Sequence, residues 1–285
     1  MVYLSSVIFS AIEYLHTQVI RQIMINEKNS LIWYKLNGLL RHVVARGVSP
    51  VIGTNLILTE YPKSGGSWIC QMLAELLEMK FPRNRLPTFT NTIIQGHYLN
   101  GFLIRKPVVV YRDGRDAMVS LYHYSMSVNE KNNERFVQHA RDVTRFSDPE
   151  DIRTNLPEFI RLAFDNKITH FNWAEFVRAW SKREDAVPVR YEDMIRDTPN
   201  ELSNLIFKVT GSMPDNRRLI QVVENYSFEA QSGRKRGIEM NNRFLRKGIS
   251  GDWKNNFTQE ALDVFNHYAS NELATLGYEV VDVIQ

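Results

Sequence analysis

The amino-acid sequence predicts a three-layer α/β fold, with a central, mainly parallel β-sheet flanked by helices. Three apolar runs with β character, at residues 54–61, 107–112 and 186–194, are each followed by a turn and a helical pattern. Repeated strand–turn–helix units build parallel sheets whose faces are covered by helices. Such sheets bind ligands at the carboxyl ends of their strands, so the three turns should lie together at one edge.

Two helical patterns precede the first strand. Apolar side chains recur at helical spacing over residues 1–25, and again over a basic run at 31–47 that should end near Pro50. We therefore expect residues 1–50 to form an amphipathic helical extension and residues 51–285 to form the main domain. Packing against that domain explains the pattern. Peripheral contact with a membrane is the alternative, because basic residues and tryptophan are typical of interfacial helices.

The remaining elements follow the strands in order. Helices are expected over residues 68–79, 113–125 and 199–211. The charged and aromatic region 129–183 should be mostly helical, with loops where an acceptor substrate can enter. Residues 234–257 are rich in Arg, Lys, Gly and Asn and have no periodicity, so they should form a long ordered loop; such loops in compact domains are usually functional.

The composition narrows the functional classes. The chain has 35 basic and 32 acidic residues, which speaks against a general nucleic-acid binder and makes any basic site local. Cys70 is the one cysteine, so no intrachain disulfide forms; we expect it to be a buried helix residue in a protein of the reducing cytoplasm. No run reaches the roughly 20 apolar residues of a membrane span. No cluster of His and Cys suggests a metal site.

The loop YPKSGGSW, at residues 61–68, combines the features of an anion site. Its glycines let the backbone turn and expose N–H groups, and the helix that follows directs its positive end at the turn. Lys63 adds a charge, while Ser64 and Ser67 add hydroxyls. The lysine precedes the glycines, unlike in the triphosphate loop G-x-x-x-x-G-K-[ST], so a smaller anion such as a 5′-phosphate with one further group fits better.

Two further motifs carry cations. In YRDGRDAMVS, Arg112 closes a strand and is placed to bind a phosphate through two N–H groups. Arg115 and Asp116 are expected to form a local ion pair that shapes this turn. The motif RKGISGDWKN contributes two cations and a glycine. It predicts a second phosphate-binding segment, formed by Arg246, Lys247 and Gly248.

These three motifs, in this order, resemble those of the sulfotransferases that use 3′-phosphoadenosine 5′-phosphosulfate (PAPS). YPKSGGSW is similar to the family's YPKSGTTW, YRDGRDAMVS to its 3′-phosphate motif, and RKGISGDWKNNFT to its RKGxxGDWKNxFT segment. The resemblance covers roughly Thr54 to Thr258. It implies a P-loop-like fold, PAPS as the sulfate donor, adenosine 3′,5′-bisphosphate (PAP) as the product, and no metal.

The resemblance also implies roles for single residues. Lys63 corresponds to the lysine that stabilises the bridging oxygen as sulfate leaves, and Trp68 to the tryptophan that stacks on adenine. The residues of the 5′-phosphate loop are Ser64, Gly65, Gly66 and Ser67. The 3′-phosphate ligands are Arg112, Ser120, Arg246, Lys247 and Gly248. The other residues near the adenine are Tyr191, Tyr226 and Phe228.

The catalytic histidine of the family lies in a K-x-H-L segment before the strand that corresponds to residues 107–112. The single histidine between the first two motifs is His97 in IIQGHYLNG, where Gln95 replaces the lysine and Tyr98 replaces the leucine. The resemblance implies that His97 is the base that takes a proton from an acceptor hydroxyl or amine during in-line transfer. Lys63 and Ser120 are the other catalytic residues that it implies.

Gly66 and Ser67 stand where the family usually has two threonines. Because the backbone N–H groups remain, we expect Gly66→Thr to hold or raise the affinity for the donor.

The partners follow less closely from the sequence. The acceptor is a small molecule, a lipid or a glycan, and the chain is a monomer or a homodimer. A family dimer motif is altered by Gln259 and Asp263, which replace a valine and a glutamate. The alternative functions are a P-loop nucleotide kinase-like phosphotransferase and a non-catalytic nucleotide-binding scaffold.

Overall fold

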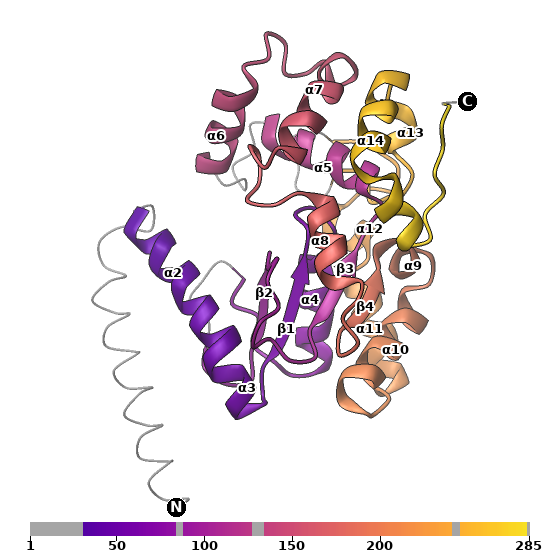
Figure 1. Ribbon diagram of the computed structural model, residues 1–285. Coiled ribbons are helices and arrows are strands. Elements are labelled where there is room, and N and C mark those ends of the chain that lie inside the picture. Colours follow the sequence, from indigo (N-terminus) through magenta and orange to yellow (C-terminus); the bar gives the residue numbers. More distant parts are fainter. Residues whose placement is uncertain (1–30, 84–87, 127–133, 241–245, 284–285) are drawn as a thin grey trace, which may run out of the picture.

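A computed structural model describes residues 31–83, 88–126, 134–240 and 246–283. At its centre lies a parallel sheet with the strand order β2-β1-β3-β4, flanked by helices (Figure 1). The strands are β1 (Leu56–Glu60), β2 (Ile93–Gly96), β3 (Val108–Tyr111) and β4 (Val187–Arg190). The three-layer α/β fold with a mainly parallel sheet is therefore confirmed.

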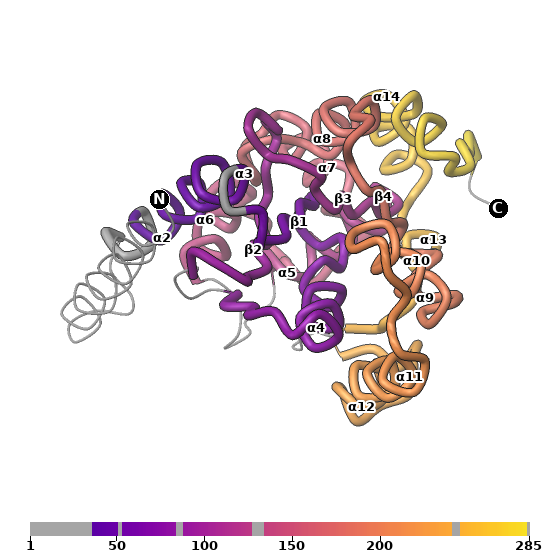
Figure 2. Tube along the Cα trace, turned by 90° about the horizontal axis from the view of Figure 1, so that it is seen from below, coloured from indigo at the N-terminus to yellow at the C-terminus, as the bar shows by residue number. Residues whose placement is uncertain are grey.

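Successive strand residues point to opposite faces of the sheet and build two cores. Ile57 and Val109 belong to the core that includes residues of α5 (Gly114–Met126), α7 (Ile152–Phe164), α8 (Trp173–Trp180) and α14 (Gln259–Thr275). Leu58 and Val110 belong to the core that includes residues of α4 (Gly66–Leu76), α10 (Thr198–Thr210) and α11 (Asn216–Asn225). Figure 2 shows α8 and α14 on one side of the strands and α4 and α11 on the other. Burial on both faces explains why the central strands are continuous apolar runs.

The carboxyl ends of the four strands meet at one edge of the sheet, because all the strand pairs are parallel. Thr59 of β1 lies opposite Gly96 of β2, and Tyr111 of β3 lies opposite Arg190 of β4. The residues that immediately follow the strands are Tyr61, His97, Arg112 and Tyr191. This is the edge at which the sequence predicts the ligand site.

The sequence predicts three of the four strands and does not predict β2. Only Ile93 and Ile94 of its residues are apolar and buried, and the strand lies at the edge of the sheet. A run this short gives too weak a periodic pattern for prediction.

Helical structure before β1 continues further than the sequence predicts. α2 (Leu31–Val43) is followed by the π-helical η1 (Val44–Val48) and by α3 (Ser49–Ile52). The predicted stop near Pro50 is wrong, because Pro50 lies in the first turn of α3, where no intrahelical N–H bond is needed. Gly53, with a φ of 71°, ends the helix instead.

η1 packs against the first core, and α2 lies beside the edge strand β2 (Figure 1). Val44 and Ala45 are buried in the first core, and Arg41 donates a hydrogen bond to the carbonyl of Gln95 on the edge strand β2. The predicted helix over residues 1–25 lies outside the described residues. The domain boundary at residue 50 stays a prediction.

The other elements agree with the predicted pattern. α6 (Glu134–Thr144), α7 and α8 supply the helices expected after residue 129. α9 (Tyr191–Arg196) follows β4 directly. α12 (Phe228–Ser232) precedes the predicted loop, and the short α13 (Trp253–Asn256) lies at its end; residues 241–245 of this loop lie outside the described part. Cys70 is buried on α4, as expected. Across the described ranges, no helix is both long and apolar enough to cross a bilayer.

Gln259 and Asp263, the two residues that alter the dimer motif, bond to each other on α14. The oligomeric state stays a prediction.

Candidate active site

The loop between β1 and α4 has the backbone geometry of an anion site. Lys63 and Gly65 have φ angles of 73° and 96°, and α4 begins at Gly66 with its positive end at the loop. A Cβ atom on Gly65 would lie 2.5 Å from the Tyr191 ring, so both the dihedral angle and the space require glycine. The Ser64 hydroxyl is buried without a hydrogen-bond partner among the described residues. A buried hydroxyl of this kind is suited to a ligand oxygen.

Glu60, the last residue of β1, places a buried carboxylate against this loop. Its two oxygens accept hydrogen bonds of 2.6 Å from the Gly66 N–H and from the Gln95 side-chain amide. The Gln95 amide also contacts the Ser67 hydroxyl, with its oxygen at 3.0 Å and its nitrogen at 2.9 Å. The prediction missed Glu60; the available signal was a single acidic residue at the end of an apolar strand.

The neighbours of Gly66 contradict the expectation that threonine fits there. A Cβ atom on Gly66 would lie 2.7 Å from both Cδ of Glu60 and Cδ2 of Leu58. Threonine would therefore force both side chains to move, and Gly66→Thr is not expected to leave the loop intact.

Lys63 is a half-buried cation. Burial and then the Arg112 guanidinium lower the pKa of Lys63 to about 8, while Glu60 acts in the opposite direction. The ammonium nitrogen lies 4.4 Å from the centre of the Tyr124 ring on α5, which stabilises the charge through a cation–π contact.

Arg112 joins the first two motifs. Its Nη1 donates to the Lys63 carbonyl at 2.9 Å, and its guanidinium lies 4.5 Å from the centre of the Tyr191 ring. Its Nε is buried and has no hydrogen-bond partner within the described part of the chain. The structure thus fixes this guanidinium while leaving one N–H for an anion.

The predicted ion pair between Arg115 and Asp116 is wrong. Arg115 pairs with Asp113 at 2.7 Å, whereas Asp116 accepts hydrogen bonds from the backbone N–H groups of Gly251 (2.6 Å) and Trp253 (2.9 Å). Burial raises the pKa of Asp116 to about 6, although Arg112 opposes this shift. Asp116 therefore anchors the third motif to α5 instead of closing the local turn.

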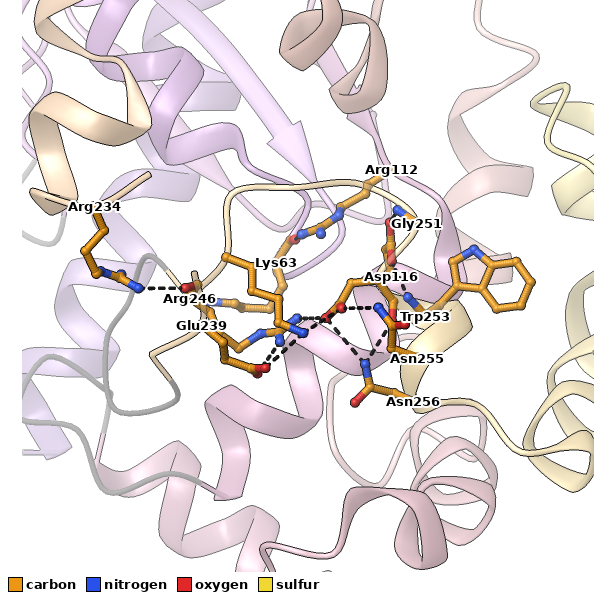
Figure 3. Close-up of polar contacts among 12 residues, drawn as sticks. Lys63, Arg112, Asp116, Arg234, Glu239, Arg246, Gly251, Trp253, Asn255 and Asn256 are labelled. Carbon is orange, nitrogen blue, oxygen red and sulfur yellow. Dashed lines mark hydrogen bonds and ion pairs between the residues drawn. The ribbon is translucent and has the colours of Figure 1, made fainter. Parts of the chain in front are cut away.

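The cations of the third motif form a cluster with two carboxylates (Figure 3). Arg246 and Lys247 each contact both Glu239 and Asp252. Burial alone would raise the pKa of Asp252, but hydrogen bonds from Lys247, Asn255 and Arg246 hold it well below its usual range. Arg246 is also close enough to Lys63 to lower the pKa of that lysine, so this cluster adjoins the first loop.

Aromatic residues border both the first loop and the third motif. The Trp68 ring lies edge-on to Tyr191, with 6.3 Å between their centres, and its Nε1 donates to the Tyr226 carbonyl at 2.8 Å. A Cβ atom on Gly248 would lie 2.3 Å from the Phe228 ring, so glycine is needed for this approach. Tyr226 contacts Trp68 through its backbone.

His97 follows β2 and is exposed. Its Nδ1 lies 2.9 Å from the Glu60 carbonyl. A carbonyl only accepts, so Nδ1 donates to it, and in the neutral imidazole Nε2 is the nitrogen with the lone pair. A neutral imidazole with an anchored Nδ1–H is oriented to act as a base through Nε2.

Most of the predicted donor-binding residues are brought together. The loop, Trp68, Arg112 and Tyr191 are linked by direct contacts, and Arg246, Lys247, Gly248 and Phe228 lie on the adjoining segment. Ser120 lies half-buried on α5, and within the described ranges it has no hydrogen bond to another site residue. The unpartnered Ser64 hydroxyl and Arg112 Nε, together with the surrounding cations, fit a nucleotide with several phosphates. Nowhere in the described ranges do three or more His, Cys, Asp or Glu residues group as metal ligands.

Comparison with known proteins gives the class. A family model described as "Sulfotransferase domain" matches residues 103–277, more than half of the chain. Sulfotransferase 1E1 of Cavia porcellus is 24% identical over 261 residues, covering 75% of this chain and 81% of that protein. The 3-alpha-hydroxysteroid sulfotransferase of Cavia porcellus is also 24% identical, over 78% of this chain and 84% of that protein. The chain belongs to the sulfotransferase family, and the predicted enzyme class is confirmed.

Solved structures share the fold. Mouse sulfotransferase SULT7A1 complexed with PAP has a TM-score of 0.61 and 18% identity, over 84% of this chain and 88% of that chain. Retinol dehydratase in complex with androsterone and PAP has a TM-score of 0.57 and 15% identity, over 85% of each chain.

Proposed function

We propose that this enzyme transfers a sulfuryl group from PAPS to the hydroxyl of a small apolar acceptor and releases PAP. The observation that carries the proposal is the joining of an anion loop to an oriented base. Lys63 and Arg112 contact each other at the loop, and His97 is anchored through Nδ1 to the residue where that loop begins.

The donor's phosphates would be held by different segments. The N–H groups at the start of α4 and the Ser64 hydroxyl would bind the 5′-phosphate end. Arg112, Arg246 and Lys247 would bind the 3′-phosphate, with Ser120 as a further proposed ligand. Trp68, Tyr191 and Phe228 would border the adenine. PAPS supplies the activated sulfuryl group, and the protein supplies orientation, charge and a proton acceptor.

The residues of the chain would act in a single in-line step. His97 Nε2 takes the proton of the acceptor hydroxyl as its oxygen forms a bond to sulfur. Lys63 and the loop N–H groups stabilise the charge that grows on the phosphate oxygen as the sulfur–oxygen bond to the donor breaks. The same base would also serve an amine acceptor.

The relatives favour an apolar acceptor. Tyr61 of the loop packs in the core against Thr169 and the Phe171 ring, which connects the segment between α7 and α8 to the loop. Two solved sulfotransferase-like structures hold androsterone or retinol, and one relative is named for hydroxysteroids.

The proposal is tested by a transfer assay with labelled PAPS. The acceptors are steroid alcohols, retinol and phenols, with glycans and phospholipids as the contrasting set. We expect label on at least one apolar alcohol or phenol and release of PAP without added metal. Transfer to glycans alone would overturn the acceptor class, and labelled phosphate transfer from ATP without transfer from PAPS would overturn the donor.

A further inference from the structure

Three residues that differ from the family's usual motifs lie around one buried carboxylate, that of Glu60. Gly66 and Ser67 replace two threonines of the loop, and Gln95 replaces a lysine. Gly66 and Gln95 bond directly to Glu60, and Ser67 bonds to it through Gln95. The Glu60 residue is 3% exposed. Packing and hydrogen bonding therefore connect these three departures.

Space is the first link between Glu60 and Gly66. Gly66 is the first residue of α4 and does not have a positive φ, so its backbone alone would accept alanine. The obstacle is the Glu60 carboxyl carbon, 2.7 Å from the position of an added Cβ, together with Leu58 at the same distance. Glycine is required here because a carboxylate occupies the room that a side chain would need.

Charge is the second link. The Gly66 N–H is one of the first donors of α4, and it is bonded to Glu60 at 2.6 Å. Gln95 satisfies the other oxygen with a neutral amide where the family has a cation. A negative charge therefore lies at the loop that would receive the 5′-phosphate, and like charges repel.

We propose that Glu60 is a positioning residue of the donor site. Its carboxylate fixes Gly66 and Gln95, imposes glycine at residue 66, and lowers the affinity of the loop for the 5′-phosphate of the donor. The last part rests on the proposed function; the first two parts do not.

The charge is tested by Glu60→Gln, which keeps the size of the side chain. The Gln95 amide already contacts Ser67 through both of its ends, so a flip lets all the hydrogen bonds of Glu60 survive as amide bonds. Affinity for PAP is measured by calorimetry at pH 6.5, where Lys63 is protonated in the wild type. We expect Glu60→Gln to bind PAP about tenfold more tightly, because one repelling charge is gone.

The control for charge is Glu184→Gln. Glu184 is exposed in the turn before β4, at the opposite end of the parallel sheet, so its loss should change PAP affinity by less than about twofold. A purely structural role for Glu60 predicts equal affinities for the wild type and Glu60→Gln. That result would overturn the charge part of the proposal.

The packing of Glu60 against residue 66 is tested by a double-mutant cycle that compares Gly66→Ala, Glu60→Ala and the double variant. The melting temperature without ligand is the readout, so the test does not depend on the donor. Gly66→Ala should lower it by several degrees in the wild type and by clearly less in the Glu60→Ala background. The Leu58 contact is present in both backgrounds and cancels.

Gly38→Ala is the matched control, because Gly38 is a helical glycine with open space around its Cβ position. It should not lower the melting temperature. Equal effects of Gly66→Ala in both backgrounds would overturn the packing part. Failure of the wild type to bind PAP would overturn the proposed donor and, with it, the charge part.

Discussion

At the residue scale, the proposed chemistry depends on two side chains with distinct electrostatics. Lys63 is a half-buried cation beside Arg112, with a pKa lowered to about 8. His97 is exposed, and its Nδ1–H is held by the Glu60 carbonyl. The charge of Lys63 therefore changes at moderately alkaline pH, while His97 offers a lone pair of fixed orientation.

The charge of Lys63 predicts how donor binding depends on pH. PAP affinity should fall as the pH rises through about 8 and above, because the protonated amine attracts the anion and the neutral amine does not. The other charged groups that act on this amine are Arg112, Glu60, Arg83 and Arg246. A bound anion favours the protonated form, so the midpoint should lie at or above this pKa.

Calorimetry with PAP between pH 7 and 9.5 checks this dependence, since phosphate groups are largely ionised there. Lys63→Arg should give a flat profile, because arginine stays charged. A wild-type affinity that does not change up to pH 9.5 would contradict the role given to Lys63.

Removal of His97 should reduce turnover with little effect on the binding of PAP. His97→Ala removes the proposed base, and we expect kcat to fall by about a hundredfold or more. Turnover is measured with labelled PAPS and an acceptor from the screen. His139→Ala is the control, because His139 is also an exposed histidine whose ring contacts a carbonyl. Near-normal turnover in His97→Ala would remove it from the role of base.

At the scale of elements, Asp116 connects two segments far apart in sequence. α5 follows β3, and the third motif precedes α14; the Asp116 carboxylate joins them through two backbone N–H groups. Arg115 adds a cation–π contact, at 4.0 Å from the centre of the Trp253 ring. The position of Arg246 and Lys247 therefore depends on this helix as well as on their own loop.

Asp116→Ala should destabilise the fold and weaken donor binding together. Two backbone donors lose their partner, and we expect a loss of about 2–4 kcal/mol in the free energy of unfolding. Urea unfolding and PAP calorimetry measure the two effects. Asp142→Ala, at an exposed position on α6, should change either quantity little. Unchanged stability in Asp116→Ala would show that the third motif is held by other contacts.

At the scale of the whole molecule, the sequence predicts the elements that have a periodic or continuous apolar pattern. It does not predict the elements whose position depends on three-dimensional packing. Apolar runs predict β1 and β3 because these strands are buried, and they predict β4 because its buried valines alternate with other residues. The edge strand β2 has two apolar residues, and its pairing with β1 comes from the tertiary fold. The helical path through Pro50 continues because proline is tolerated in the first turn of α3.

The candidate site was predictable where motifs specify the backbone, as at Lys63, Gly65 and Arg112. Glu60 was missed because its role depends on which face of β1 its side chain occupies and on the space above Gly66. The pairing of Arg115 with Asp113, and of Asp116 with residues 251 and 253, likewise depends on contacts that sequence spacing does not encode.

The central claim is that the site binds a 3′-phosphorylated adenosine nucleotide without metal. The most direct test is the melting temperature of the full chain with PAP, in the presence of EDTA, against ATP with magnesium. PAP at about 100 times its Kd should stabilise the fold by about 2.7 kcal/mol, which raises the melting temperature by several degrees. We expect this rise with PAP and little change with ATP and magnesium. Stabilisation by ATP and magnesium but not by PAP would contradict the claim and favour a nucleotide kinase.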